Sequence, residues 1–66
     1  MINKNSKIYV AGHNGLVGSA ILRKLKEKKY KNIITVERRK LDLLNQKDVF
    51  SFFKRQKPDL VIIAAA

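Results

Sequence analysis

The chain's three glycines, Gly12, Gly15 and Gly18, all lie in one short run with Gly-x-x-Gly-x-x-Gly spacing. The run follows the apolar, strand-like segment 7–11 and precedes a segment with helical periodicity. Glycine permits a tight turn at the first position, close approach of a ligand to the backbone at the second, and helix-to-strand contact at the third. Unpaired N–H groups at a helix start attract phosphate. We therefore predict a loop that binds a dinucleotide pyrophosphate; the alternative is a turn that binds nothing.

Strand-like and helix-like segments alternate along the whole sequence. We expect strands at 7–11, 33–37 and 60–64, a helix over 15–29, and a second helix that begins near Asn45 and ends before Pro58. This alternation predicts an α/β fold of parallel strands joined by right-handed crossovers. We interpret residues 1–66 as the N-terminal half of a Rossmann dinucleotide-binding domain. Its three parallel strands are expected in spatial order three-two-one, with both helices on one face.

Apolar side chains at helical spacing mark the expected core faces of both helices. Val17, Ala20, Ile21 and Leu25 form this pattern in the first helix. In the second, the aromatic side chains are expected to pack on the sheet rather than to stack on nucleic-acid bases: Phe50, Phe52 and Phe53.

The expected topology leaves one face of the sheet bare and the first strand at an edge. An all-parallel sheet is normally covered on both faces. We therefore interpret the chain as the N-terminal piece of a longer enzyme and expect it to be catalytically inactive alone.

Composition excludes several other kinds of site. The chain has no cysteine and one histidine, so we expect no metal site. No apolar run has the roughly 20 residues needed to span a bilayer, and the N-terminus lacks a signal-peptide core. We expect a cytoplasmic protein with no membrane partner.

The formal net charge is +10, from 15 Lys and Arg against 5 Asp and Glu. Its clusters, 23–29 and 54–57, fall at the ends of the expected helices, where cations complement the helix dipole. No aromatic residue is interleaved with them for base stacking. We expect a solvated lysine surface and no nucleic-acid partner. The alternative from another class is a small basic nucleic-acid-binding module, which salt-dependent binding to DNA would reveal.

The end of the second expected strand bears on the choice of cofactor. Glu37 there favours NAD, because a carboxylate accepts hydrogen bonds from the ribose hydroxyls. Arg38 and Arg39 follow directly, and an arginine at this place grips the 2′-phosphate of NADP. We predict NADP, with NAD as the alternative, because the cations outnumber the single carboxylate.

Other polar and small residues are expected near the same ligand. Asp42 either accepts a hydrogen bond from an adenine amino group or stabilises the turn before the second helix. His13 is expected to face the cofactor or serve the loop structure rather than act as an acid or base. Neither Tyr9 nor Tyr30 has a lysine four residues later, so we predict no catalytic residue. The predicted cofactor-binding residues are Gly12, His13, Asn14, Gly15, Leu16, Val17, Gly18, Glu37, Arg38, Arg39, Asp42, Leu43, Ala64, Ala65 and Ala66.

Five stretches together resemble the N-terminus of the GDP-L-fucose synthases, a family of extended short-chain dehydrogenase/reductases. They are Val-Ala-Gly-His-Asn-Gly-Leu-Val-Gly-Ser-Ala-Ile at 10–21, Leu-Asp-Leu at 41–43, Phe-Phe at 52–53, Lys-Pro-Asp at 57–59 and Ala-Ala-Ala at 64–66. The resemblance implies NADPH-dependent epimerisation and reduction of GDP-4-keto-6-deoxy-mannose to GDP-L-fucose. It also implies a nucleotide-sugar substrate and a homodimeric enzyme. The alternative within this class is another nucleotide-sugar epimerase or dehydratase.

The resemblance also assigns roles to individual positions. The glycine run matches the family's pyrophosphate loop, Arg38 its 2′-phosphate arginine, and Asp42 its adenine-side position, while 64–66 match the strand end that lines the cofactor. Asn14 stands where many members have arginine, which weakens the case for strict NADP selectivity. The family's catalytic serine and Tyr-x-x-x-Lys pair have no counterpart among these 66 residues.

Overall fold

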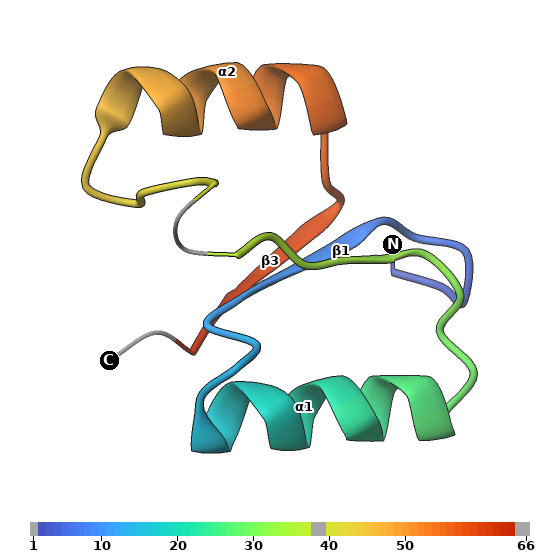
Figure 1. The fold of residues 1–66 in the computed structure, drawn as a ribbon. Helices are drawn as coiled ribbons and strands as arrows, with labels where there is room; N and C mark the ends of the chain where they lie inside the picture. Colours follow the sequence, from blue (N-terminus) through green and yellow to red (C-terminus); the bar gives the residue numbers. More distant parts are fainter. Residues whose placement is uncertain (1, 38–39, 65–66) are drawn as a thin grey trace.

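Strands and helices alternate as expected in a computed structural model of the chain, which describes residues 2–37 and 40–64 (Figure 1). The α/β class is thereby confirmed. The elements are shorter than the sequence pattern predicted, above all the second strand, which was expected over 33–37. Their bounds are β1 Ile8–Ala11, α1 Leu16–Glu27, β2 Ile33–Ile34, α2 Gln46–Gln56 and β3 Leu60–Ile63.

The strands are parallel, as predicted, but their spatial order is β2-β1-β3, so the expected order three-two-one is wrong. The chain crosses from β1 to β2 and then returns past β1 to place β3 on the other side. The pairing lengths give a physical reason. β2 pairs with β1 only through Ile33 and Ile34, whereas β3 pairs with β1 along four residues, Leu60–Ile63. Pairing with the free edge of β1 therefore gives β3 a longer run of backbone hydrogen bonds than pairing with the outer edge of the two-residue strand β2 would.

The reversal of direction places the two helices on opposite faces of the sheet, with β1 between them (Figure 1). The expectation of two helices on one face, with a bare opposite face and β1 at an edge, is therefore wrong. β1 is instead the central strand, and all four of its residues are buried. The edge strands β2 and β3 are less buried than β1, with intermediate or exposed residues throughout.

The larger core lies between β1 and α2. The ring of Tyr9 packs against those of Phe52 and Phe53, with ring centroids 4.9 and 5.9 Å apart. Ala11 and Leu41 complete the buried cluster. Phe52 and Phe53 thus confirm the predicted helix-to-sheet packing. Phe50 does not, because 69% of its surface is exposed and it lies off the apolar stripe of α2.

The apolar stripe of α1 is only partly covered. Ile21 and Leu25 are half-buried as predicted, but Ala20 is exposed and Val17 is 60% exposed, so these two expected core residues are not in the core. Val17 lies in the first turn of α1, which lines a cavity at the end of the sheet instead of packing on it.

Hydrogen bonds between Lys7 and Asp59, which we call the clasp, join the residues that precede β1 and β3 at the amino ends of these strands. The backbone N–H of Lys7 donates to the Asp59 carboxylate at 2.7 Å, and the Asp59 N–H donates back to the Lys7 carbonyl at 2.7 Å. The Lys7 ammonium also donates to the Gln56 carbonyl in the last turn of α2 at 2.8 Å. The clasp fixes where β3 enters the sheet.

The termini of α2 follow the sequence signals. Asn45 is the N-cap, as predicted, and its side-chain oxygen accepts a hydrogen bond from the Asp48 N–H at 3.1 Å. At the other end Lys57 adopts a left-handed conformation with φ 49°, directly before Pro58. Lys29, after α1, is also left-handed, with φ 70°. Glycine adopts this conformation without the penalty that a Cβ brings.

We expect Lys29→Gly and Lys57→Gly each to raise the free energy of unfolding, by about 0.5–1 kcal/mol, because they remove left-handed strain. Lys28 provides a matched control: it is a neighbouring lysine with φ −85°, so Lys28→Gly is expected to destabilise the chain. Urea unfolding followed by circular dichroism measures all three. Equal effects at positions 28 and 29 would contradict the assignment of strain.

Candidate dinucleotide site

The glycine run forms a tight turn between β1 and α1. Gly12 has φ 84°, a left-handed conformation that favours glycine. The Gly15 N–H donates to the Gly12 carbonyl at 3.1 Å, which closes the turn directly after the last residue of β1. The first glycine therefore has the role predicted for it: it lets the chain leave the strand abruptly.

Gly18 is buried in the first turn of α1, against the turn that Gly12 begins. A Cβ placed on Gly18 would overlap the Gly12 carbonyl oxygen, lie 2.6 Å from the Gly12 carbonyl carbon, and lie 3.1 Å from the Cα of His13. All these atoms belong to the backbone and have no side-chain freedom with which to move aside. The third glycine is therefore required by the packing of helix against loop.

Gly15 differs from both, because nothing in the fold requires it to be glycine. Its φ is −78°, and a Cβ there would come no closer than 3.5 Å, an ordinary contact with the Gly12 carbonyl. Gly15 is also the N-cap of α1, where it supplies no side-chain hydrogen bond, and the first turn of the helix contains no acidic residue. The positive end of the helix dipole thus stands beside an exposed backbone that lacks a side chain.

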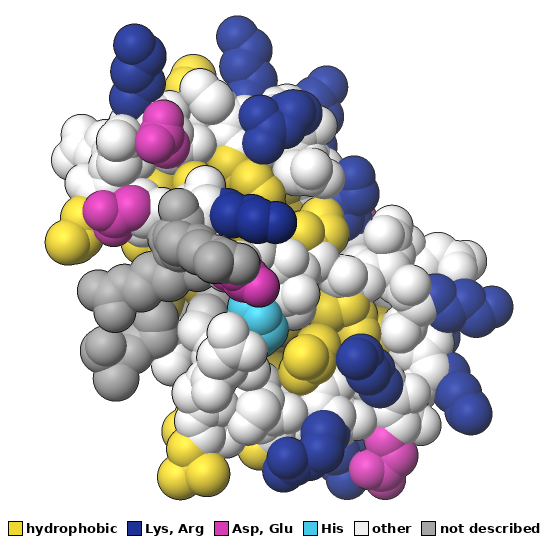
Figure 2. Space-filling view, in the orientation of Figure 1, with side chains coloured by type: hydrophobic (Ala, Val, Ile, Leu, Met, Phe, Trp, Pro, Cys, Tyr) yellow, Lys and Arg dark blue, Asp and Glu magenta, His cyan; other side chains and the backbone are white. Residues whose placement is uncertain are grey.

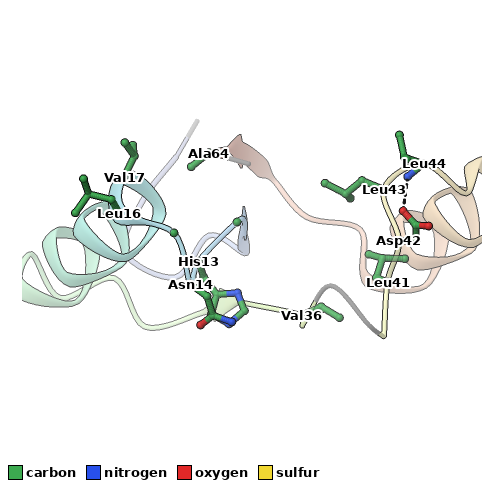
Figure 3. Close-up of a pocket in the computed structure, with 12 residues that line it drawn as sticks. His13, Asn14, Leu16, Val17, Val36, Leu41, Asp42, Leu43, Leu44 and Ala64 are labelled. Atoms are coloured by element: carbon green, nitrogen blue, oxygen red, sulfur yellow. Dashed lines mark hydrogen bonds between the residues drawn. The ribbon is translucent and has the colours of Figure 1, made fainter. Parts of the chain in front are cut away.

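An open cavity of about 720 Å³ lies at the carboxyl ends of the strands. The turn after β1 and the start of α1 form one side, and the segment before α2 forms the other. Val36, which follows β2, and Ala64, which follows β3, lie between them (Figure 3). Ala64 belongs to this central part, and its N–H donates to the Ala11 carbonyl at 2.9 Å. The cavity is lined by Gly12, His13, Asn14, Gly15, Leu16, Val17, Val36, Leu41, Asp42, Leu43, Leu44 and Ala64.

Asp42 serves the turn before α2, one of the two roles left open for it. Its carboxylate accepts a hydrogen bond from the Leu44 N–H at 2.9 Å, drawn as the dashed line in Figure 3. Its carbonyl accepts another from the Asn45 N–H at 3.0 Å. This turn holds Asp42 and Leu43 at the wall of the cavity, opposite the glycine loop.

Most of the predicted cofactor residues meet at this cavity, but not all of them. Gly18 is buried behind the loop and supports it. Glu37 is not among the described residues that line the cavity, and its carbonyl accepts hydrogen bonds from the Lys40 and Leu41 N–H groups. The remaining predicted residues, Arg38, Arg39, Ala65 and Ala66, lie outside the described part of the chain.

Three lining residues were missed: Val36, Leu41 and Leu44. Val36 sits just before the predicted ribose carboxylate, and the two leucines flank the predicted adenine-side residues. Their positions were a usable signal, since an adenine ring needs apolar walls as well as hydrogen-bond partners. The cavity therefore combines an apolar wall with a loop suited to phosphate.

Burial shifts the pKa of a phenol in the central strand of the sheet. Tyr9 is buried in β1, and burial raises the pKa of its phenol above the ordinary value of 10.0, so it stays protonated at neutral pH. Within 2–37 and 40–64, no group of three or more His, Cys, Asp or Glu side chains is arranged to hold a metal ion. Over the same residues, no helix is long and apolar enough to cross a membrane.

The sheet order gives the cavity its significance. In open α/β sheets, ligands bind outside the carboxyl ends of the strands where the strand order reverses. Here the order reverses at β1, between β2 and β3, and the glycine loop lies at that point. The fold and the loop define this chain as a Rossmann-type unit of the dinucleotide-binding class.

Comparison with known proteins agrees with this class. The family model described as "NAD dependent epimerase/dehydratase family" matches residues 8–66, and the chain belongs to that family. GDP-L-fucose synthase 1 of Arabidopsis thaliana is 54% identical over 66 residues, which is 100% of this chain and 20% of that protein. The chain thus spans about a fifth of the length of the curated relatives it matches.

Solved structures give the same result. A structure titled DdhaC is 57% identical, with a TM-score of 0.96, and the match covers 100% of this chain and 19% of that one. The GDP-mannoheptose C4 reductase MlghC of Campylobacter jejuni, solved with NADP bound, is 41% identical with a TM-score of 0.96. That match covers 100% of this chain and 21% of the reductase.

Proposed function

We propose that this chain is the cofactor-binding part of an NADP-dependent reductase and epimerase that makes GDP-L-fucose from GDP-4-keto-6-deoxy-mannose. The observation that carries the proposal is the start of α1, where Gly15 leaves a space that a Cβ would fill beside an N-terminus without a side-chain cap. The name of the Arabidopsis relative supports the reaction, and the NADP in the C. jejuni reductase supports the cofactor. A reduced nicotinamide supplies hydride when bound.

The described residues divide the binding task between two walls. The N–H groups at the start of α1 and the helix dipole suit a pyrophosphate. On the opposite wall, the turn built on Asp42 would hold the adenine end against the apolar side chains of Val36 and Leu43. We further propose that Arg38 binds the 2′-phosphate and that the protein acts in the cytoplasm as a homodimer.

A second substrate also has support. The C. jejuni reductase acts on a GDP-mannoheptose, so a GDP-linked heptose is the alternative to the 6-deoxy sugar. The proposed cofactor site is the same for both candidate substrates. We propose that the chain alone binds cofactor without turnover, because neither Tyr9 nor Tyr30 has a lysine four residues on. NADPH oxidation by this chain with either GDP-sugar would contradict this last proposal.

The glycine loop tests cofactor binding directly. Gly15→Ala is expected to leave the free energy of unfolding within about 1 kcal/mol of the unsubstituted chain, because the new Cβ meets only an ordinary contact. The same methyl group would obstruct the approach of a pyrophosphate, so NADPH binding should weaken at least roughly tenfold. Fluorescence titration with NADPH and urea unfolding of the same samples separate the two effects. Unchanged NADPH affinity would refute the proposed site.

Arg38 tests the choice between the two cofactors. We expect Arg38→Ala to weaken NADPH binding roughly ten- to a hundredfold, since a charge-assisted hydrogen bond contributes about 1.5–3 kcal/mol. NADH lacks the 2′-phosphate and serves as the internal control, so its affinity should change little. Equal losses for NADPH and NADH would contradict the role given to Arg38 and leave the loop assignment standing.

A further inference from the structure

We propose that the amino end of the sheet is a docking surface for an acidic polypeptide segment. The surface is formed by four lysines in the turns that lead into the two edge strands, which we call the amino-edge lysines: Lys28, Lys29, Lys31 and Lys57. This inference is independent of the dinucleotide site, which lies at the opposite end of the strands.

The topology gathers these lysines on one edge. The turn containing Lys31 leads into β2 and the turn containing Lys57 leads into β3, on either side of β1. The Lys31 N–H donates to the Lys4 carbonyl at 3.0 Å, and the Asp59 N–H donates to the Lys7 carbonyl at 2.7 Å, so both turns are fastened to the segment before β1. Neighbouring strands lie roughly 4.8 Å apart, which places the two turns about 10 Å apart.

Several other cations at this end already have a structural role. Lys24 and Lys26 lie in the last turn of α1, and Lys54 and Arg55 lie in the last turn of α2, where they complement the helix dipoles. Two more interact with the fold directly: the Lys7 ammonium donates to the Gln56 carbonyl at 2.8 Å, and that of Lys4 lies 4.1 Å from the centre of the Tyr30 ring.

Within the described residues, the side chains of the amino-edge lysines make no hydrogen bond or ring contact, although Lys28 and Lys57 are the C-caps of α1 and α2 and therefore also lie near the helix dipoles. All four are exposed, and none of them is in an ion pair within residues 2–37 and 40–64, where the recorded pair joins Lys24 and Glu27. Lys29 and Lys57 also occupy left-handed positions that glycine would fill with less strain. Figure 2 shows Lys and Arg side chains projecting from the periphery of the molecule, with few acidic side chains among them.

These lysines are too far from the cavity to attract the cofactor at physiological salt. The described chain measures 32 × 26 × 15 Å, and the strands separate its amino end from the glycine loop. Charges are screened over about 8 Å at 0.15 M ionic strength. Steering of an anionic dinucleotide therefore does not account for the amino-edge lysines.

The chemistry of the surface favours carboxylates on a polypeptide. A second copy of the chain is a poor partner, because it carries 5 acidic residues and a net charge of +10. The amino-edge lysines include no arginine, which could bind a phosphate through two parallel hydrogen bonds. The nearby Tyr30 ring is covered by Lys4, so it offers no open face on which a nucleic-acid base could stack. Among the described residues, the large exposed apolar side chains that a membrane would meet at this end are Ile2 and Leu60, which are 39% and 37% exposed.

A matched pair of triple variants tests the proposal. The first removes three amino-edge charges as Lys29→Gly, Lys31→Gln and Lys57→Gly, in which the two glycines relieve left-handed strain and so favour folding. The control removes three exposed charges that lie away from this edge, as Arg23→Gln, Lys40→Gln and Lys47→Gln. Both variants carry a net charge of +7, because each removes three positive charges from the original +10.

Binding of poly-L-glutamate is measured by titration at 0.15 M NaCl, with urea unfolding as the check on stability. We expect the amino-edge variant to bind roughly tenfold more weakly than the control. Equal binding by the two variants would overturn the proposal, because charge alone and not position would then decide affinity. Tighter binding of the unsubstituted chain to a 20-base-pair DNA duplex or to phosphatidylglycerol vesicles under the same conditions would also overturn it.

Discussion

Gly18→Ala should destabilise the chain severely, by at least about 3 kcal/mol, and abolish dinucleotide binding with it. The added methyl group would overlap the carbonyl of Gly12, and helix and loop must separate to admit it. A loss of this size is a large fraction of the roughly 5–15 kcal/mol that stabilises a typical domain. Circular dichroism with urea unfolding gives the stability, and amide exchange of β1 reports whether the sheet survives.

The control for this change is Gly15→Ala, three residues earlier in the same run. It adds the same methyl group at a site with room for it, so its effect on folding should be small. If both substitutions destabilise equally, helix propensity or a general property of the loop is responsible, and the specific contact with Gly12 is refuted.

Phe52→Ala should cost about 3–5 kcal/mol of unfolding free energy. Its ring is 4% exposed and lies 4.9 Å from the Tyr9 ring and 5.7 Å from that of Phe53, so truncation leaves a cavity in the core under α2. Phe50→Ala is the matched control on the same helix. Phe50 is 69% exposed, so its loss should change stability by less than about 0.5 kcal/mol. Similar costs for the two would contradict the burial described here.

The glycine loop was predictable because each requirement in it is local. A left-handed turn at Gly12, a helix start at Gly15 and a close backbone contact at Gly18 all depend on residues within one turn of chain. The N-cap at Asn45 was predictable for the same reason, since its partner is Asp48. Such features need no knowledge of how the strands are arranged.

The strand order was not predictable from periodicity, because apolar patterning states that a strand is buried but not which neighbour buries it. The two-residue pairing of β2 could not be anticipated from the expected strand 33–37. The order decides much of the site: with β3 beside β1, Ala64 comes next to Ala11 and closes the cavity floor. The expected order would have put the second strand between them.

The exposure of Phe50 and Val17 shows a further limit of predicting buried residues from helical spacing. Phe50 stands outside the i, i+3, i+4 positions that Val49, Phe52 and Phe53 occupy, so a stricter use of helical spacing would have excluded it. Val17 does follow the spacing in α1, but its turn lies beyond the sheet, beside the cavity. Spacing identifies one face of a helix and gives no information on where along the helix the sheet ends.

The clasp between Lys7 and Asp59 joins residues 52 positions apart, and it has a consequence for how the molecule forms. Residues up to the end of β3 must be synthesised before that strand can pair with β1, and closing so long a loop has an entropic cost. The local turns, including the glycine loop, can form early. The cavity needs Ala64 beside Ala11, so it is completed only after β3 has paired with β1, and ligand binding reports that pairing.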